Sequence, residues 1–474
     1  MLLNYLLFAG LPAFAQCAPL PDSSKDLLQS LNLPVDEVGA TAFSLLYGSP
    51  LVGFRQLAST SGILELDGTN VLASHATAAN ASLHVVVRPN VDTIYSTGAF
   101  DLSATDVVVT LPPMEDDRFY LFGFYDPYGD LFATLGSVSS STPGRYLLRA
   151  TDASCDGYEG CITSPTSIGM LLIRVEIKNN TTDVTKVAAY LSKSSLFPVN
   201  SHEPFNPPLI AADFADLSNS TALSTLEMTA RLQSRAPPET ARFQHAVPAI
   251  LALAGIRNGS YHQPACVNLT LASALVEAAV TTFTEAPSSY PDLGNGWSVL
   301  NNTYSGSFEY GAAVVARAIV AAALYLQVTP ANALYPTLGS TQTTLTDSEA
   351  YLFTFSGRPP VASNGFWSLT MYDDAGYLVA NAENTYAVGD RSNITFADGD
   401  LVYNDYDGAA DGTFQVLVQD AGVPPPSNWT ANWLPAPAGG GSFTVTFRLY
   451  APTAALSDGS YVYPLVTKVN AITA

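Results

Sequence analysis

The sequence predicts a mainly β protein with α-helices, in which two antiparallel β-sandwich or jelly-roll domains flank a helical segment. Short β-branched and aromatic runs, separated by Pro, Gly and Asp clusters, occupy two stretches of the chain. Between them the apolar residues recur at helical spacing. With 474 residues, 47% of them hydrophobic, the chain exceeds what one core usually supports, so we expect two domains.

The first predicted domain is β-rich, covers residues 35–183 and begins with a helix. From Val35 to Leu57 the apolar positions follow helical spacing, with Pro34 near the start. Four runs typical of strands follow, at residues 85–87, 107–110, 119–125 and 171–177.

The predicted helical segment covers residues 184–346, and its best helices are 223–233, 241–256, 269–283 and 310–328. The last is almost continuously apolar, with Arg317 in its middle. An arginine at a bilayer centre costs about 2.5–3.5 kcal/mol on insertion scales. We therefore expect a buried, alanine-rich core helix and no stable membrane span.

The second predicted β-sandwich domain covers residues 347–474. Strand-like runs occur at 350–356, 366–372, 413–418 and 442–449. Turn signals such as Asp373-Asp-Ala-Gly376 separate these runs.

Residues 1–15 have the pattern of a removable signal peptide, so we expect a secreted protein. A short apolar run ends at the small residues Ala13 and Ala15, which predicts cleavage before Gln16. The alternative is a buried N-terminal helix, since the only positive charge is the α-amino group. The run is too short for a membrane span, which needs roughly 20 apolar residues.

Asn-x-Ser/Thr acceptors are more frequent than the roughly four expected by chance, which predicts a glycoprotein with these asparagines on its surface. The nine asparagines are Asn80, Asn179, Asn180, Asn219, Asn258, Asn268, Asn301, Asn393 and Asn428.

Charge and cysteine content limit the partners. The formal net charge of −22 repels nucleic acid and anionic membranes, so we expect neither as a partner. In an oxidising compartment Cys155 and Cys161 are close enough in sequence to form a disulfide, and Cys17 and Cys266 could form a second. No metal-binding spacing, P-loop or dinucleotide fingerprint is present, so we predict neither metal nor cofactor.

Several motifs resemble two families known as domains of unknown function. The first part resembles domain of unknown function 1254 at Tyr47-Gly-Ser-Pro-Leu-Val52, Arg88-Pro-Asn-Val-Asp-Thr-Ile-Tyr-Ser96, Arg118-Phe-Tyr-Leu-Phe-Gly-Phe-Tyr-Asp126 and Ser164-Pro-Thr166. The last part resembles domain of unknown function 1214 at Arg358-Pro-Pro-Val361, Phe366-Trp-Ser-Leu-Thr-Met-Tyr-Asp373, Asn432-Trp-Leu-Pro-Ala-Pro437 and Phe447-Arg-Leu-Tyr-Ala-Pro452, with Asp458-Gly459 and Pro464 following.

The resemblance extends from about residue 35 onward, with the motifs in the expected order. It implies two β-rich domains with helices between them and a homo-oligomer, but it implies no reaction. One motif departs from the family pattern, because Asn384-Thr-Tyr386 stands where the family usually has Asn-Arg-Tyr. A basic group able to contact an anionic ligand is therefore missing there.

The candidate catalytic residues are Asp92, Tyr95, Arg118 and Asp126. If the two strands that carry them pair, Asp92 meets Asp126 or Arg118 near one rim of the sheet. Two adjacent carboxylates would raise one pKa and form a general acid/base pair. The alternative is structural, because Asn-x-Asp-Thr also binds turn backbone and an Asp–Arg pair can lock a sheet corner.

Aromatic residues and Asn90 are the candidate ligand-binding residues. Four aromatic residues could stack on a sugar or an aromatic ligand: Tyr372, Tyr386, Trp429 and Trp433. Trp367 is a further candidate for ligand binding. The alternative for Asn432–Pro437 is a rigid packed loop. The acidic segment Asp405–Asp411 lacks the full calcium-loop pattern, and we expect a solvated turn there.

These features favour a secreted protein with a small-molecule pocket between the first sandwich and the helices. Its expected role is acid/base catalysis on a polar or carbohydrate-like compound. Two alternatives stay open: a non-catalytic glycan- or surface-binding protein, and a structural homo-oligomer.

Overall fold

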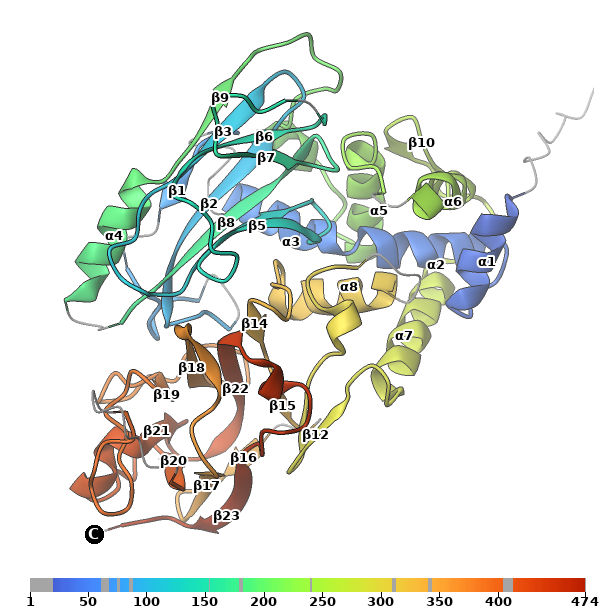
Figure 1. The fold of residues 1–474 in the computed structure, drawn as a ribbon. Coiled ribbons are helices and arrows are strands. Elements are labelled where there is room, and N and C mark those ends of the chain that lie inside the picture. Colours follow the sequence, from blue (N-terminus) through green and yellow to red (C-terminus); the bar gives the residue numbers. More distant parts are fainter. Residues whose placement is uncertain are drawn as a thin grey trace, which may run out of the picture.

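The computed structural model describes residues 20–60, 68–74, 77–84, 88–152, 154–178, 182–238, 241–308, 313–339, 343–403 and 412–473. In Figure 1 an N-terminal β unit lies above a C-terminal β unit, and a helical body lies beside both. Some predicted features lie outside the described residues: the signal peptide, Cys17, the strand at 85–87, Asn179, Asn180 and the acidic turn.

The N-terminal β unit contains two sheets. Sheet N1 has the order β1 (Ala73–Ser74), β2 (Thr93–Asp101), β8 (Ile168–Glu176), β4 (Tyr120–Tyr125), β5 (Leu131–Gly136). Sheet N2 has the order β7 (Gly160–Thr163), β6 (Gly144–Arg149), β3 (Asp106–Leu111), β9 (Ser195–Val199). Apolar side chains of both sheets form one core, against which α4 (Asp183–Lys193) also packs. The pairing is antiparallel except between β6 and β7.

The helical body consists of α1 (Asp22–Ser30), α2 (Glu37–Gly48), α3 (Pro50–Arg55), α5 (Thr221–Leu232), α6 (Ala241–Leu253), α7 (Leu269–Glu285) and α8 (Ala313–Leu324). The Asp36 side chain caps α2 by accepting a hydrogen bond from the Gly39 amide. Helix α2 is buried along ten of its twelve residues, because other helices surround it. The core of this body continues onto the outer face of sheet N1 through Ala99, Leu121 and Met170.

The C-terminal β unit also contains two sheets. Sheet C1 has the order β14 (Ala333–Leu334), β22 (Gly441–Pro452), β18 (Val361–Asp373), β19 (Ala387–Gly389), and β16 (Thr343–Leu345) also pairs with β22. Sheet C2 has the order β21 (Trp433–Ala436), β20 (Phe414–Asp420), β17 (Glu349–Phe355), β23 (Leu465–Asn470). An aromatic core joins them, with the rings of Phe355 and Phe414 stacked 4.6 Å apart.

Short elements complete the described chain. They are η1 (Gln56–Thr60), η3 (Ala211–Phe214), β10 (Ile256–Arg257), β11 (Ser260–Tyr261), β12 (Asp292–Gly294), β13 (Trp297–Ser298), η4 (Asn302–Tyr304), β15 (Thr337–Leu338), η5 (Ser427–Asn432) and η6 (Ala454–Leu456).

The predicted fold class is confirmed: the chain is mainly antiparallel β with helices between two β units. Whether the two β units are sandwiches or jelly rolls stays a prediction. The helix expected at the start of the first β domain is present as α2 and α3, but it packs with the later helices. The apolar segment around Arg317 is α8, and no helix among the described residues combines the length and the apolar character needed to cross a bilayer.

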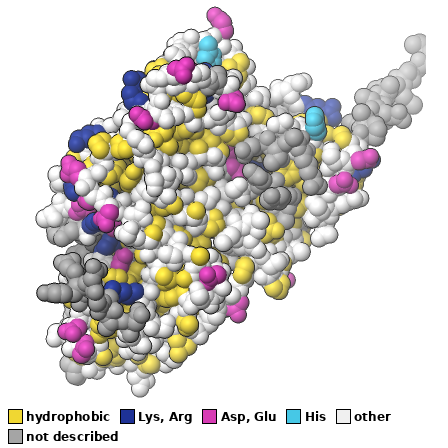
Figure 2. Space-filling model, in the orientation of Figure 1, with side chains coloured by type: hydrophobic (Ala, Val, Ile, Leu, Met, Phe, Trp, Pro, Cys, Tyr) yellow, Lys and Arg dark blue, Asp and Glu magenta, His cyan; other side chains and the backbone are white. Residues whose placement is uncertain are grey.

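The predicted disulfide is present between Cys155 and Cys161, whose Cα atoms lie 5.7 Å apart. Cys266 is a free, exposed thiol. In Figure 2 charged side chains are sparse and scattered over the face shown. The described sequon asparagines are exposed, except Asn301, which is partly buried; the exposed ones are Asn80, Asn219, Asn258, Asn268, Asn393 and Asn428.

Replacing Phe355 by alanine should destabilise the C-terminal core. The Phe355 side chain is 0% exposed, and large-to-small changes of this kind typically cost about 3–5 kcal/mol. Phe205→Ala is the matched control, because Phe205 is 53% exposed and its removal should change stability by less than about 0.5 kcal/mol. Urea unfolding followed by fluorescence would check both. Equal midpoints for the two variants would contradict the assigned core.

Candidate functional site at the junction of the two β units

Sheet C1 has a polar face that is buried, although polar sheet faces usually meet solvent. Strands β18 and β22 pair in a register that puts Ser368 opposite Arg448 and Phe366 opposite Tyr450. Because side chains alternate along a strand, Trp367, Phe447 and Leu449 point into the C-terminal core. Their neighbours form the other face, which is buried except for the partly exposed Thr444: Phe366, Ser368, Thr370, Tyr372, Thr444, Thr446, Arg448 and Tyr450.

The segment that leads into β2 covers part of this face. The Asn90 side-chain amide donates to the Tyr450 hydroxyl over 2.6 Å. The Tyr372 hydroxyl donates to the Pro89 carbonyl over 2.8 Å. The two β units therefore meet where side chains of C1 contact the segment just before β2. We call this contact region the junction.

Asp92 connects the two units at the junction. Its Oδ1 atom accepts from Arg391 Nη2 at 2.5 Å, and its Oδ2 atom accepts from the Ser368 hydroxyl at 2.6 Å. Arg391 also donates to the Ile177 carbonyl and lies 4.2 Å from the centre of the Phe366 ring. Both oxygens of Asp92 are therefore engaged in holding the C-terminal unit against the N-terminal one.

Two buried arginines lie among tyrosines next to this connection. Arg174 on β8 donates to the Tyr125 hydroxyl at 3.3 Å and to the Leu326 carbonyl at 2.8 Å. Arg448 on β22 donates to the Tyr372 hydroxyl at 2.6 Å.

We call the whole group the arginine–tyrosine cluster: Arg174, Arg448, Tyr95, Tyr125, Tyr335, Tyr372 and Tyr450. Within it Tyr95 is the register partner of Arg174, and the rings of Tyr335 and Tyr450 lie 6.3 Å apart. Tyr95 and Tyr335 are partly exposed, whereas the other members are buried. The cluster therefore reaches the surface at these two phenols.

Several buried polar atoms at the junction have no hydrogen-bond partner among the described residues. These are Arg448 Nη1, Arg391 Nε, Asp390 Oδ1 and the hydroxyls of Thr93, Thr97, Thr370 and Thr444. Buried polar groups are nearly always paired in native proteins, because an unpaired one costs about 1–3 kcal/mol. Such unpaired atoms on β2, β18 and β22 are the groups that a polar ligand or ordered water would satisfy.

The carboxyl groups beside Arg391 have shifted pKa values. Burial raises the pKa of Asp390 to about 7, while Arg391 opposes the rise and Glu176 adds to it. Burial likewise raises the pKa of Glu176, again against the effect of Arg391. The positive Arg391 guanidinium thus opposes the rise in the pKa of both Glu176 and Asp390, and the pKa of Asp390 lies near neutral pH.

Burial also raises the pKa of the Tyr335 and Tyr372 phenols, although the arginines of the cluster oppose this shift. The phenols therefore stay protonated at neutral pH and act as hydrogen-bond donors. Among the described residues, no three His, Cys, Asp or Glu side chains lie close enough together to hold a metal ion.

The predicted meeting of Asp92 with Asp126 or Arg118 does not occur. Strands β2 and β4 do not pair, because β8 lies between them and is antiparallel to both. Since β2 and β4 then run parallel, Asp92 before β2 and Asp126 after β4 lie at opposite ends of sheet N1. Asp126 instead forms a turn, in which its Oδ1 accepts from the amides of Tyr128 and Asp130, and Gly129 supplies the φ of 87°.

Arg118 lies at the same end of N1 as Asp92 but binds other carboxylates. Its guanidinium contacts Asp116 at 2.7 Å and Asp183 at 2.9 Å, and it also donates to the Glu176 carbonyl. Every nitrogen of this side chain is used, so Arg118 ties β4 to α4. Of the candidate catalytic residues, only Asp92 and Tyr95 lie at the junction.

The candidate ligand-binding residues separate into two groups. Asn90 and Tyr372 lie at the junction. Trp367 lies inside the C-terminal core, and Trp433 packs against Leu417, so neither indole has an exposed face for stacking. Tyr386 is partly exposed and donates to the Asn384 side chain at 3.3 Å.

The junction includes residues that the sequence analysis did not select, namely Arg174, Glu176, Tyr335, Asp390, Arg391, Arg448 and Tyr450. A signal was present in two strands. In Ile173-Arg-Val-Glu176 and Phe447-Arg-Leu-Tyr450 a charged or phenolic residue alternates with an apolar one. Such alternation indicates a polar sheet face, but it does not reveal that another domain buries that face.

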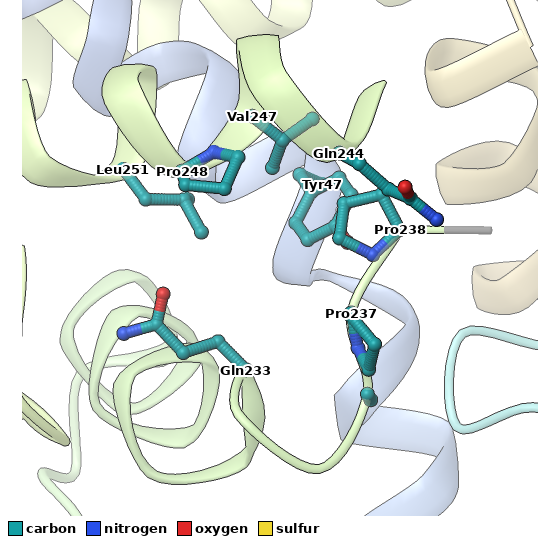
Figure 3. A pocket seen from close by; sticks show the side chains of 9 residues that line it. Tyr47, Gln233, Pro237, Pro238, Gln244, Val247, Pro248 and Leu251 are labelled. Carbon is teal, nitrogen blue, oxygen red and sulfur yellow. The ribbon is translucent and has the colours of Figure 1, made fainter. Parts of the chain in front are cut away.

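A separate cavity of about 110 Å³ lies in the helical body (Figure 3). Its walls are mostly apolar: Tyr47, Gln233, Ala236, Pro237, Pro238, Gln244, Val247, Pro248 and Leu251. One wall residue, Tyr47, has the Arg317 guanidinium 4.9 Å from the centre of its ring, and Arg317 pairs with Asp130 at 3.1 Å. The cavity shares no residue with the junction and offers few polar groups.

The fold and the junction define a class of protein in which two β units, bridged by helices, enclose a polar contact region. Family models identify its members: residues 69–198 match "Protein of unknown function (DUF1254)", and residues 332–454 match DUF1214, a second protein of unknown function. The chain belongs to these two families, in the predicted order. No curated protein matches it.

Among solved structures, the chain is similar to the VPA0106 protein from Vibrio parahaemolyticus. The TM-score is 0.62 at 17% identity, and the match covers 91% of this chain and 100% of that one. This likeness shows the fold alone. A crystal structure of an uncharacterized protein from Burkholderia cenocepacia matches with a TM-score of 0.44 and 15% identity, over 95% of each chain.

The raised pKa of Asp390 predicts a pH dependence of stability. The folded pKa of about 7 lies above the ordinary value of 3.8, so the folded chain binds this proton more tightly than the unfolded chain. The stability from this group is complete below the ordinary pKa and is lost as the pH rises through about 7. Asp390→Asn, which stays neutral, should therefore gain in melting temperature over the wild type between about pH 5 and pH 8.

Asp374→Asn is the matched control, because Asp374 is an exposed carboxylate in a turn. Its melting curve should follow that of the wild type at every pH. Parallel pH profiles for the wild type and Asp390→Asn would contradict the prediction.

Proposed function

We propose that this protein binds a small polar molecule at the junction between its two β units and performs acid/base chemistry on it. The supporting observation is the group of unpartnered polar atoms: Arg448 Nη1 and the threonine hydroxyls on β2, β18 and β22. A bound molecule with several polar atoms would supply the missing hydrogen bonds. The partly exposed Tyr95 and Tyr335 mark where it would enter.

Asp390 and Glu176 are the proton-transfer groups of this proposal. A general acid or base works best with a pKa near the working pH, and the pKa of Asp390 is about 7. Asp92 is a positioning residue, since its carboxylate holds Arg391 and Ser368. Arg118 and Asp126 have structural roles.

We also propose that the protein is secreted and N-glycosylated. The signal-peptide pattern, the exposure of six sequon asparagines and the Cys155–Cys161 disulfide support this. A glycan-binding role through Trp433 lacks similar support, because that ring is buried.

Removing an unpartnered hydroxyl should impair function without impairing folding. In Thr370→Val a methyl group replaces the hydroxyl, which has no partner among the described residues, so the melting temperature should not fall. Loss of one hydrogen bond to the bound molecule should weaken binding or KM about tenfold. Thr225→Val is the matched control, because the buried Thr225 hydroxyl donates to the Thr221 carbonyl within α5.

The substrate would be sought by comparing metabolites of a deletion strain and its parent, with purified protein added back. A compound whose conversion returns with the wild type and returns more weakly with Thr370→Val would support the proposal. Full activity of Thr370→Val would place the chemistry elsewhere. Binding without conversion, by wild type and Asp390→Asn alike, would favour the non-catalytic alternative.

The export proposal predicts a processed and glycosylated chain. When the full sequence is expressed in a secreting eukaryotic host, the mature protein should begin at Gln16, and peptide N-glycosidase should lower its mass. N-terminal sequencing and mass spectrometry would check this. A protein that stays inside the cell with Met1 retained would contradict it.

A further inference from the structure

We propose that the molecule bound at the junction is an anion, a small compound with a carboxylate or another oxyanion group, held by Arg174 and Arg448. The inference rests on the proposed function, because it names the chemical class of ligand for the same site. It follows from the charge balance of the buried arginines, which differs at the junction from the rest of the described chain.

Elsewhere in the described chain, each buried arginine has a carboxylate partner. Arg118 has Asp116 and Asp183 at 2.7 and 2.9 Å, Arg235 has Asp213 at 2.8 Å, and Arg317 has Asp130 at 3.1 Å. Arg391, which is partly buried, has Asp92 at 2.5 Å. This is the expected pattern, since a buried charge without an opposite charge is strongly destabilising.

Arg174 and Arg448 depart from this pattern. They are 7% and 2% exposed, and neither has a carboxylate within ion-pair distance among the described residues. Their acceptors are neutral: the Tyr125 hydroxyl and the Leu326 carbonyl for Arg174, and the Tyr372 hydroxyl and the Arg88 carbonyl for Arg448. Two buried positive charges thus have only neutral partners among the described residues.

Asp92 does not supply the missing charge. It acts on Arg448 at longer range, but its oxygens already bind Arg391 and Ser368. Tyr335, Tyr372 and Tyr450 do not supply it either, since burial raises the pKa of each phenol and keeps it protonated. The phenols and the unpartnered threonine hydroxyls are instead donors, and they would add hydrogen bonds to a bound anion.

The free donor at Arg448 indicates what kind of acceptor fits. Its Nη1 atom has no hydrogen-bond partner in the part of the chain that the structure describes, while Nη2 donates to the Tyr372 hydroxyl. A guanidinium presents its N–H groups in a planar fork that matches the two oxygens of a carboxylate or of a phosphate. The Arg174 guanidinium lies 5.9 Å from the centre of the Tyr95 ring, and the Arg448 guanidinium lies 5.6 Å from the centre of the Tyr372 ring. Tyr335 and Tyr450 act electrostatically on both arginines. A bound oxyanion would offset this buried positive charge.

The net charge of −22 makes this site distinctive. A strongly acidic protein repels anions in general, so anion binding should be confined to places where positive charge is concentrated. Binding should also be specific for the shape and the hydrogen bonds of the anion, and chloride at equal ionic strength should not replace it.

The test is isothermal titration calorimetry on the full mature chain at constant ionic strength in chloride buffer. The anionic probes are oxalate, benzoate, inorganic phosphate and sulfate, and the neutral probes are glucose and glycerol. We expect at least one anion to bind and neither neutral probe to bind. Arg448→Gln should weaken that binding about 10- to 100-fold, the value of a charged hydrogen bond. Arg257→Gln is the matched control, because Arg257 is exposed on the helical body, and it should bind as the wild type does.

Arg448→Lys keeps the positive charge but loses the planar guanidinium geometry. Its affinity for the anion should therefore fall less than that of Arg448→Gln. If Arg448→Gln does not fold, Arg448→Lys and Tyr335→Phe decide the question, since both keep the buried charge and both should weaken anion binding. Anion binding that none of the folded variants changes would overturn the proposal. So would the absence of any heat or melting shift with all four anions.

The outcomes separate this inference from the proposed function. A neutral probe whose binding is weakened by Thr370→Val and unchanged by Arg448→Lys would overturn the anion and retain the junction as a ligand site. If neither anions, neutral probes nor a metabolite extract bind in a way that depends on Thr370 or Arg448, both proposals fail.

Discussion

The carboxylate of Asp92 is the constraint on which the arrangement of the two β units depends. It enters from the start of β2 and binds Arg391 and Ser368, two residues that follow it by roughly 300 positions in the chain. Because both partners belong to the C-terminal unit, these contacts hold the polar face of sheet C1 against the N-terminal unit. The hydrogen bond from Asn90 to Tyr450 and that from Tyr372 to Pro89 reinforce the same contact.

One consequence is that polar side chains become buried without enough partners. Packing alone would favour apolar residues on a face that another domain covers, as in the two β-unit cores. The junction has instead two arginines with neutral acceptors and several unpaired hydroxyls. Such an arrangement lowers folding stability. It is expected at a site where these groups form hydrogen bonds with a ligand. Of the carboxyl groups beside Arg391, Asp390 has a pKa near neutrality because of its burial.

Local sequence patterns were sufficient for much of the fold. The runs at 107–110, 119–125 and 350–356 are strands β3, β4 and β17, and the helical spacing at 223–233 and 269–283 marks α5 and α7. Their periodicities record which face is buried, so they are visible in a single sequence. The order of strands in a sheet is not visible in a single sequence, because it depends on which distant segment pairs with each strand. The insertion of β8 between β2 and β4 separates Asp92 from Asp126 for this reason.

The candidate site was predicted in part for the same reason. Asp92, Tyr95, Asn90 and Tyr372 stand in motifs with an unusual density of polar residues, and all four lie at the junction. Arg174 and Arg448 each stand alone between apolar neighbours, and their partners come from segments far away in the chain. Trp367 and Trp433 were expected to contact a ligand, but both side chains are buried. Large aromatic side chains fill cores more often than they line sites.

Anomalous diffraction from crystals grown with selenate would show most directly whether the junction holds an anion. Selenate is a tetrahedral oxyanion whose selenium atom can be located without reference to the protein. We predict an anomalous peak beside Arg448 Nη1 and Arg174, at a distance that places selenate oxygens in hydrogen-bond contact with both guanidiniums and with the Tyr335 hydroxyl. A junction that holds only water under these conditions, with selenate bound elsewhere or nowhere, would contradict it.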